Sequence, residues 1–219
     1  MALKILVFLG SVRTSSPPTP ARLGMRVATS CVHQLAQSNH DAVLIDPLDY
    51  DLSDPFTPLF SYAPGKAPEK IQQLAHQIET ADGYVMVSPE YNHAMSPALA
   101  NLLNHFGSSL FSYKPSVIAT YSAGQWGGVR AAVNMRTFLS ELGCLPVSAM
   151  IHIPKAQDVL KEDGAYAEGV NADDWAGYYE RAFTQLTWWA MATKRYRSSE
   201  EGKHRPTAFT RSPSQRNAP

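Results

Sequence analysis

The 219-residue chain has 19 Lys and Arg against 19 Asp and Glu, so its formal net charge is zero, and 44% of its residues are hydrophobic. This composition allows one well-packed domain and provides no strong field for nucleic acid. No apolar run approaches the roughly 20 residues of a membrane-spanning helix, and MALKILVFLGS reads as a strand rather than a secretion signal. We therefore expect a soluble, cytoplasmic protein.

Apolar strands alternate with helical patterns along the chain. Five apolar runs are predicted strands, at residues 3–9, 41–46, 83–88, 115–122 and 146–153. Segments with helix-like spacing of apolar residues separate them, and a long helix follows near 172–194. Because parallel strands need crossover connections, this alternation predicts an α/β fold with a doubly wound five-stranded parallel sheet and helices on both faces.

The end of the chain differs from the rest in charge. Residues 194–219 contain seven Lys or Arg and two Glu, a net charge of +5, which leaves −5 for residues 1–193. We expect residues 1–195 to form the folded domain. Residues 196–219 are predicted to be a basic, disordered tail, because this stretch is polar and lacks periodicity. Cys31 and Cys144 have no metal-site spacing and are expected to be buried thiols.

The loop after the first strand combines hydroxyl groups with arginines. Open α/β sheets bind ligands outside the carboxyl ends of their strands, so this loop is a candidate site. Its sequence, GSVRTSSPPTPARLGMR, precedes a predicted helix and suits a phosphate monoester. It is neither a Walker A loop nor G-x-G-x-x-G, which argues against a nucleoside triphosphate and the usual dinucleotide site. A solvated Ser/Pro loop is the alternative.

Two further loops carry groups suited to a planar ring. After the third strand, Pro89 stiffens the turn, Tyr91 can stack on a flat ring and Asn92 can hydrogen-bond to a heterocycle's edge. After the fourth strand, SAGQWGG offers three glycines that permit close backbone approach. Either loop alone is explained equally well as ordinary packing or as a flexible turn. Together the three loops predict a phosphate pocket beside a ring pocket.

These segments resemble the NAD(P)H-dependent FMN reductase family. Its members are flavodoxin-like flavoproteins and include azoreductase-like, quinone-reducing and chromate-reducing proteins. The resemblance is carried by LGSVR, by PEYNHAMSPALANLLNHF, and by YSAGQWGG followed by LSELGCLPV, and it spans roughly residues 3–153. It implies bound FMN, NAD(P)H as co-substrate, and ping-pong electron transfer to flavin, quinone or similar small acceptors. It also implies a homodimer or homotetramer.

The resemblance assigns residues to the cofactor. Ser11 and Arg13 would hold the FMN phosphate. ARLGMRVA would make Arg22 the family's second arginine, but several extra residues precede it, so Arg22, Ser16 and Thr19 are all candidates to complete the phosphate site. The remaining implied cofactor-binding residues are Pro89, Glu90, Tyr91 and Asn92 along the isoalloxazine ring, and Ser122, Gly124 and Gly127 near its pyrimidine side.

No side-chain acid or base and no metal ligand is predicted. Glu90, His93 and His105 are titratable, and we expect surface or core roles for them. Two alternatives stay open: a flavodoxin-like electron carrier, although such carriers are strongly acidic, and a non-catalytic flavin-binding interaction module with a basic docking tail. A serine hydrolase is excluded because TYSAGQ lacks the first glycine of G-x-S-x-G.

Overall fold

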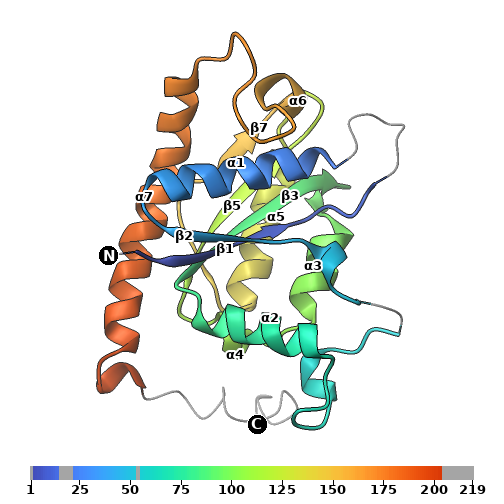
Figure 1. Cartoon of the computed structure of the whole chain (residues 1–219), viewed down its shortest axis with the longest axis vertical. Coiled ribbons are helices and arrows are strands. Elements are labelled where there is room, and N and C mark those ends of the chain that lie inside the picture. The colour runs from blue at the N-terminus through green and yellow to red at the C-terminus, as the bar shows by residue number, and fades with distance from the viewer. Residues whose placement is uncertain (1, 15–21, 53–54, 204–219) are drawn as a thin grey trace.

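The computed structural model describes residues 2–14, 22–52 and 55–203, and its centre is a parallel sheet (Figure 1). The strands are β1 (Lys4–Leu9), β2 (Asp41–Ile45), β3 (Gly83–Tyr91), β5 (Pro115–Tyr121), β6 (Leu145–Pro146) and β7 (Ile151–Ile153). Their order is β2-β1-β3-β5-β6, with β7 also paired to β5. With β6 and β7 counted as one interrupted strand, this is the 2-1-3-4-5 order of flavodoxin-like sheets. The predicted fold class is confirmed.

Helices cover both faces of the sheet. On one face lie α1 (Leu23–Gln37) and α7 (Ala172–Arg197); on the other lie α2 (Glu69–Thr80), α3 (Pro97–Asn104) and α5 (Val129–Glu141), as Figure 1 shows. Short helices α4 (Ser108–Phe111) and α6 (Ala156–Val159) lie in connections. Successive residues of β1 alternate between the two cores: Ile5 and Val7 pack with α1 and α7, and Leu6 and Phe8 pack with the other three helices.

The two cysteines belong to different cores. Cys31 is buried on the α1 face and Cys144 on the α5 face, and both are free thiols. Burial raises the pKa of the Cys144 thiol to about 12, and that of Cys31 further still. Both thiols therefore stay protonated at neutral pH, as expected for structural rather than reactive cysteines.

The fifth predicted strand, 146–153, is interrupted in the structure. Within 146–153 the ladder to β5 is broken between β6 and β7, and side chains hydrogen-bond to several of the backbone groups there. Arg136 donates from Nη2 to the carbonyl oxygens of residues 147 and 148, at 2.8 and 2.7 Å. Arg181 donates to the carbonyl of residue 150 at 2.9 Å, and the Gln185 side chain accepts from the amide of residue 149 at 3.0 Å.

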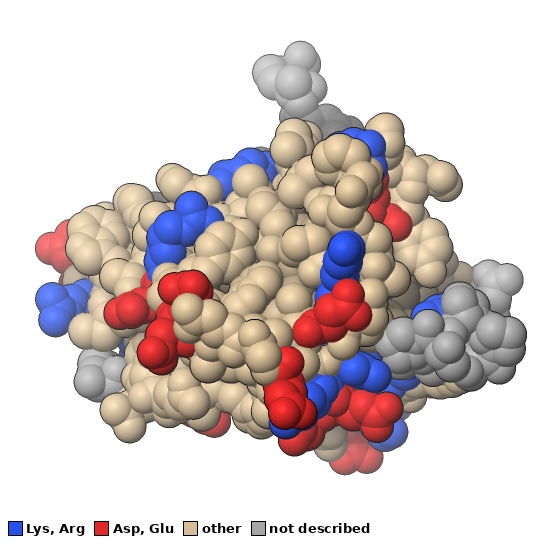
Figure 2. All heavy atoms as spheres, turned by 90° about the horizontal axis from the view of Figure 1, so that it is seen from above, with Lys and Arg blue, Asp and Glu red and all other residues tan. Residues whose placement is uncertain are grey.

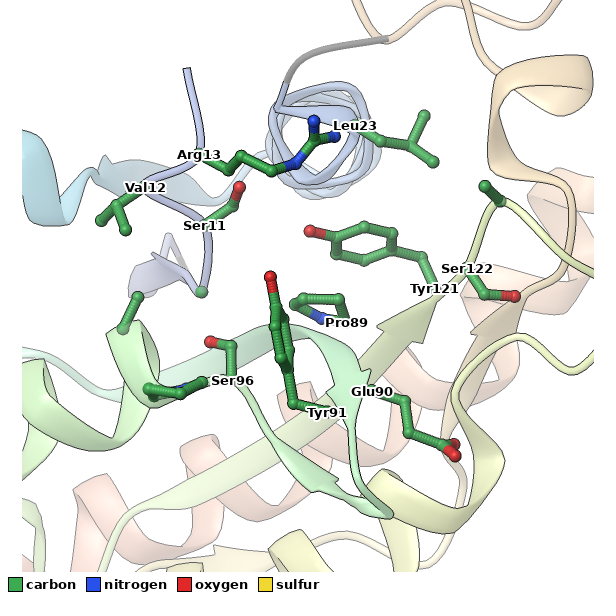
Figure 3. A pocket seen from close by; sticks show the side chains of 14 residues that line it. Ser11, Val12, Arg13, Leu23, Pro89, Glu90, Tyr91, Ser96, Tyr121 and Ser122 are labelled. Carbon is green, nitrogen blue, oxygen red and sulfur yellow. The ribbon is translucent and has the colours of Figure 1, made fainter. Parts of the chain in front are cut away.

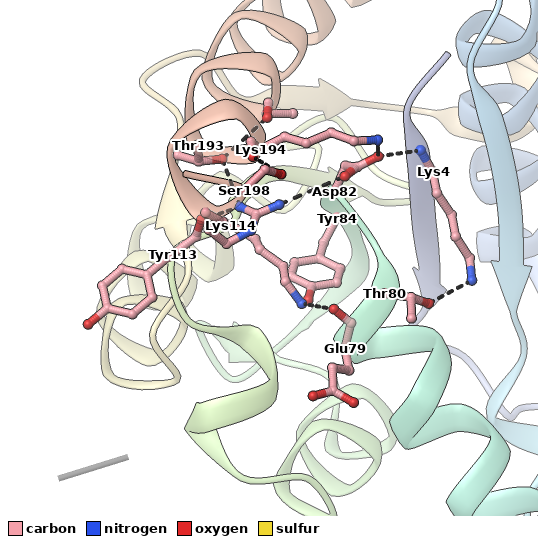
Figure 4. Close-up of polar contacts among 12 residues, drawn as sticks. Lys4, Glu79, Thr80, Asp82, Tyr84, Tyr113, Lys114, Thr193, Lys194 and Ser198 are labelled. Atoms are coloured by element: carbon pink, nitrogen blue, oxygen red, sulfur yellow. Dashed lines mark hydrogen bonds and ion pairs between the residues drawn. The ribbon is translucent and has the colours of Figure 1, made fainter. Parts of the chain in front are cut away.

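A polar cluster holds the elements together at the amino ends of the strands (Figure 4). The Asp82 carboxylate accepts hydrogen bonds from the Lys4 amide at 3.0 Å and from Lys194 Nζ on α7 at 2.8 Å. Lys114 is 5% exposed, and its ammonium donates to three backbone carbonyls at the ends of α2 and α4, at 2.7–2.8 Å. These contacts tie the amino ends of β1 and β3 to helices α2, α4 and α7.

The last described residues extend past position 195. Helix α7 continues to Arg197, and a 3-10 turn occupies Glu201–Lys203. Residues 204–219 of the predicted tail lie outside the described part. The aromatic residues of α7 divide between core and surface: Tyr179 and Phe183 are buried, whereas Trp188 and Trp189 are exposed.

The charges of the surface are mixed. On the face seen in Figure 2, basic and acidic side chains are interspersed, with no single-sign surface over that face. None of the helices in the described ranges is both long and apolar enough to cross a membrane.

Candidate functional site

A cavity of about 400 Å³ opens at the carboxyl ends of β1, β3 and β5 (Figure 3). It lies where the chain order switches between β1 and β3, the position at which sheets of this topology bind ligands. Its size is within the usual range of small-molecule sites. Six predicted site residues line it: Ser11, Arg13, Pro89, Glu90, Tyr91 and Ser122.

The loop after β1 approaches β3 closely. The Gly10 amide donates to the Val87 carbonyl at 2.7 Å, and a Cβ at position 10 would lie only 2.5 Å from that oxygen. Any side chain here would push the loop away, so the close approach requires glycine. In Figure 3 the Ser11 hydroxyl and the Arg13 guanidinium lie on the same side of the cavity, near the Tyr121 hydroxyl. We call these three groups the polar corner.

Tyr121 is the last residue of β5 and is 4% exposed. Burial raises the pKa of its phenol, although its hydrogen bond with the Ser11 side chain and the nearby Arg13 charge act in the opposite direction. The phenol is therefore neutral at physiological pH. Its hydroxyl packs against the first turn of α1, where a Cβ at Gly24 would lie 2.2 Å from the oxygen.

The Pro89–Asn92 segment is a β-hairpin rather than a loop. β3 runs on to Tyr91 and pairs antiparallel with β4 (Ala94–Met95). Asn92 and His93 form the two-residue turn with φ of 50° and 66°, the positive values that hairpin turns of this length favour. Asn92 therefore sits at the tip and does not line the cavity. The Tyr91 ring, 48% exposed, stands at the cavity in Figure 3.

Glu90 ties this hairpin to α5. Its Oε1 accepts from Arg130 Nε at 2.9 Å, and the Arg130 guanidinium lies 6.0 Å from the centroid of the Trp126 ring. In Figure 3 the Glu90 carboxylate points away from the polar corner. Its Oε2 is buried and accepts no hydrogen bond within the described ranges. The ion pair thus positions the hairpin and leaves one acceptor for a further donor.

The glycine-rich loop after β5 is organised by its own serine. Ser122 Oγ donates to the Gly124 carbonyl at 2.7 Å and accepts from the Gly127 amide at 2.8 Å. Gly127 has a φ of 59° and packs against Pro154. Gly124 and Gly127 do not line the cavity, whereas Ser122 and its neighbour Ala123 do.

Arg22 is occupied elsewhere. Its guanidinium forms two hydrogen bonds to the Asp46 carboxylate, at 2.7 and 2.8 Å, and one to the Ser11 carbonyl at 2.8 Å. It does not line the cavity. The other candidates for completing the phosphate site, Ser16 and Thr19, lie outside the described residues.

The two histidines that the sequence analysis considered have other surroundings. His93 is exposed at the hairpin tip. His105 is 3% exposed, with Nδ1 hydrogen-bonded to the Asn101 carbonyl at 2.8 Å and its ring 4.7 Å from that of Phe56. Neither lines the cavity.

Sequence reasoning missed the residues that begin helices or end strands. The cavity is also lined by Gly10, Val12, Leu23, Ser96, Pro97, Ala98, Tyr121 and Ala123. Ser96 caps α3 by accepting from the Leu99 amide at 3.1 Å, and Leu23 begins α1. Their position in the chain could have predicted them. In such a sheet, a helix that follows the carboxyl end of a strand begins on the side where ligands bind.

Comparison with known proteins identifies the family. Residues 3–158 match the family model described as NADPH-dependent FMN reductase. The chain belongs to this family. Its relatives include an NADPH azoreductase of Bacillus sp. (strain OY1-2), 31% identical over 133 residues that make up 53% of this chain and 75% of the azoreductase.

Other similarities are more partial. A 2-hydroxy-1,4-benzoquinone reductase of Burkholderia sp. is 33% identical over 62% of this chain and 69% of that protein. A quinone reductase of Escherichia coli (strain K12) is 37% identical, but the match covers only 33% of this chain and 40% of the relative. Among solved structures, the flavoenzyme FerB of Paracoccus denitrificans superposes with a TM-score of 0.65 at 18% identity, over 85% of this chain and 98% of FerB.

The matches confirm the predicted family, the flavodoxin-like fold and an FMN-dependent, NAD(P)H-using oxidoreductase class.

Proposed function

We propose that this FMN reductase family member passes electrons from NAD(P)H through bound FMN to quinones or similar small planar acceptors, which take turns with the nicotinamide in the same cavity. The supporting observation is the cavity itself, in which the polar corner adjoins a slot bordered by Pro89 and Tyr91. This shape and chemistry fit a phosphorylated planar molecule. The relatives named azoreductase and quinone reductase point to the same acceptor class.

The polar corner is assigned to the FMN phosphate. Ser11 brings a hydroxyl, Arg13 a permanent positive charge and Tyr121 a second hydroxyl, and a charge-assisted contact of this kind contributes about 1.5–3 kcal/mol. The neutral Tyr121 phenol can donate a hydrogen bond, whereas a phenolate would repel the phosphate. Arg13 is therefore the main charged partner in the corner.

The hairpin and the glycine-rich loop are assigned to the flavin ring. Bound FMN would supply the hydride and electron chemistry. The chain's residues position it: Pro89 and Tyr91 border the ring, and the Glu90–Arg130 ion pair holds their strand in place. Ser122 fixes the loop on the other side. Asn92, Gly124 and Gly127 act on the shapes of these two turns rather than on the cofactor.

The test is FMN uptake by the purified protein, followed by reduction. We expect a yellow protein whose visible flavin absorption bleaches with NAD(P)H in the absence of air and returns with a quinone. Arg13→Ala should weaken FMN affinity by roughly 10- to 100-fold, which corresponds to loss of one charge-assisted contact. The matched control is Arg195→Ala, which removes an arginine from the exposed face of α7.

The outcomes separate the alternatives. Protein that stays colourless after incubation with FMN would overturn the proposal. FMN binding with single-electron reduction but no steady NAD(P)H consumption would favour an electron carrier. FMN binding with no turnover on quinones, azo dyes or free flavins would favour a binding module.

We also propose that the chain acts as a homo-oligomer in the cytoplasm. Trp126 precedes α5 and Val133 lies on it, and these residues are 61% and 64% exposed, so contact with a second copy would remove apolar surface from water. Family resemblance implies a dimer or tetramer. Sedimentation of the wild type and of Val133→Glu tests this: a larger species in the former and a smaller one in the latter supports it.

A further inference from the structure

One hydrogen bond to the loop that carries Ser11 and Arg13 comes from a residue outside the cavity. Arg22 Nη2 donates to the Ser11 carbonyl at 2.8 Å, and the same guanidinium meets both Asp46 oxygens. The Arg22 and Asp46 side chains are only 16% and 14% exposed. A bidentate arrangement of this kind fixes the orientation of the guanidinium plane.

Asp46 is itself held in place. It directly follows β2 and caps the 3-10 turn Pro47–Asp49 by accepting from the Leu48 amide at 3.0 Å. The chain of contacts therefore runs from the end of β2, through the Asp46 carboxylate and the Arg22 guanidinium, to the carbonyl of Ser11. Ser11 supplies one hydroxyl of the polar corner, and Arg13 follows two residues later.

The backbone of Arg22 is consistent with a position fixed by these contacts. Its φ of 49° and ψ of 47° are left-handed, an unfavourable conformation for a residue with a Cβ. Such strain persists where surrounding contacts determine the geometry. Its remaining Nε is buried and has no hydrogen-bond partner within the described ranges, so the guanidinium is held through its terminal nitrogens.

We propose that Arg22 is a positioning residue, not a phosphate ligand: paired with Asp46, it holds the Ser11 carbonyl and thereby aims Ser11 and Arg13 at the phosphate. This inference rests on the proposed FMN site. It differs from the assignment implied by family resemblance, in which the second arginine contacts phosphate. Because the Asp46 carboxylate pairs with the Arg22 guanidinium, the positive charge that the polar corner offers to a phosphate is that of Arg13.

The decisive variant removes the pair without changing net charge, namely Arg22→Met combined with Asp46→Asn. We expect FMN affinity, measured by quenching of flavin fluorescence, to fall at least tenfold, because the loop loses its support. Its dependence on salt should match that of the wild type, since no charge facing the phosphate has been removed. Arg13→Ala should instead flatten the salt dependence. In an Arg13→Ala background, deleting the pair should cost less than it does in the wild type, because the part of its effect that runs through Arg13 is already lost while the part that runs through Ser11 remains.

Riboflavin is the control ligand, because it has the ring system without the phosphate. Retained riboflavin affinity shows that the double variant has folded with its ring site intact. If that variant does not fold, Arg22→Lys is the alternative test. Lysine keeps the positive charge, but its single ammonium cannot reproduce the planar guanidinium that bonds Asp46 and Ser11 together. A positioning role predicts that Arg22→Lys loses FMN affinity, whereas a charge-only phosphate ligand predicts that it keeps it.

Three results would overturn the inference: FMN affinity of the pair deletion within twofold of wild type, a salt dependence as flat as that of Arg13→Ala, or undiminished affinity in Arg22→Lys. Each presupposes a wild type that binds FMN. A wild type that fails to bind FMN would instead overturn the proposed function, so the two failures can be told apart.

Discussion

Replacing Gly24 by alanine should destabilise the protein, although alanine is the better helix former. Gly24 lies in the first turn of α1, and an added Cβ would lie 2.2 Å from the Tyr121 hydroxyl oxygen and 2.8 Å from its Cζ. Tyr121 is 4% exposed and cannot simply swing into solvent. Overpacking of this kind costs about 1–3 kcal/mol, against the ~1 kcal/mol that a helical Gly→Ala change gains. We expect a net loss of up to about 2 kcal/mol.

The measurement is the free energy of unfolding from urea titration, together with FMN affinity. Gly177→Ala is the matched control, because it makes the same change in helix α7, where nothing lies within 4 Å of the added Cβ. That variant should be unchanged or up to ~1 kcal/mol more stable. Tyr121→Phe removes the oxygen at 2.2 Å, so it should recover part of the loss when combined with Gly24→Ala. A Gly24→Ala protein as stable as Gly177→Ala would refute the reasoning.

Three other changes test separate parts of the structure. Lys114→Met removes the ammonium donor from three carbonyls, two of which keep a hydrogen bond from the Tyr84 hydroxyl, and should cost about 1–3 kcal/mol of unfolding free energy without altering FMN affinity in the folded protein; an unchanged urea midpoint would contradict this. His93→Gly relieves a left-handed residue at the hairpin tip and should stabilise by about 0.5–1 kcal/mol with turnover intact, and a large loss of turnover would instead give His93 a chemical role. Burial and, secondarily, Arg181 lower the pKa of His152. The folded state therefore binds fewer protons than the unfolded state below about pH 6.5, and stability should fall as pH drops through that region. In His152→Gln, the melting temperature should fall less between pH 7.5 and 5.5 than it does in the wild type. An equal fall in the two proteins would show that His152 is not the cause.

The sequence was most informative where local chemistry decides the structure. The apolar runs identified the parallel sheet, and the loops that follow β1, β3 and β5 do border one cavity. Ser11, Pro89 and Tyr91 line that cavity because they lie at the carboxyl ends of β1 and β3, the edge at which sheets of this topology bind ligands.

The missed features depend on contacts between distant segments. Arg22 meets Asp46 across 24 positions, and nothing in either neighbourhood specifies that pairing. Tyr121 continues an apolar run, so the sequence predicts it only as part of a strand. The structure shows that its hydroxyl faces the polar corner of the cavity. The sequence does not predict the hairpin, because its turn is Asn-His rather than the usual Asn-Gly and its second strand has only two residues.

The interruption between β6 and β7 has a consequence for solubility. A continuous outer strand would expose a row of amides and carbonyls that a neighbouring chain could extend into a larger sheet. Here Arg136, Arg181 and Gln185 already occupy backbone groups along that margin. Edge-to-edge aggregation is thereby disfavoured on this side of the molecule. The protection comes from side chains on α5 and α7 rather than from the strand itself.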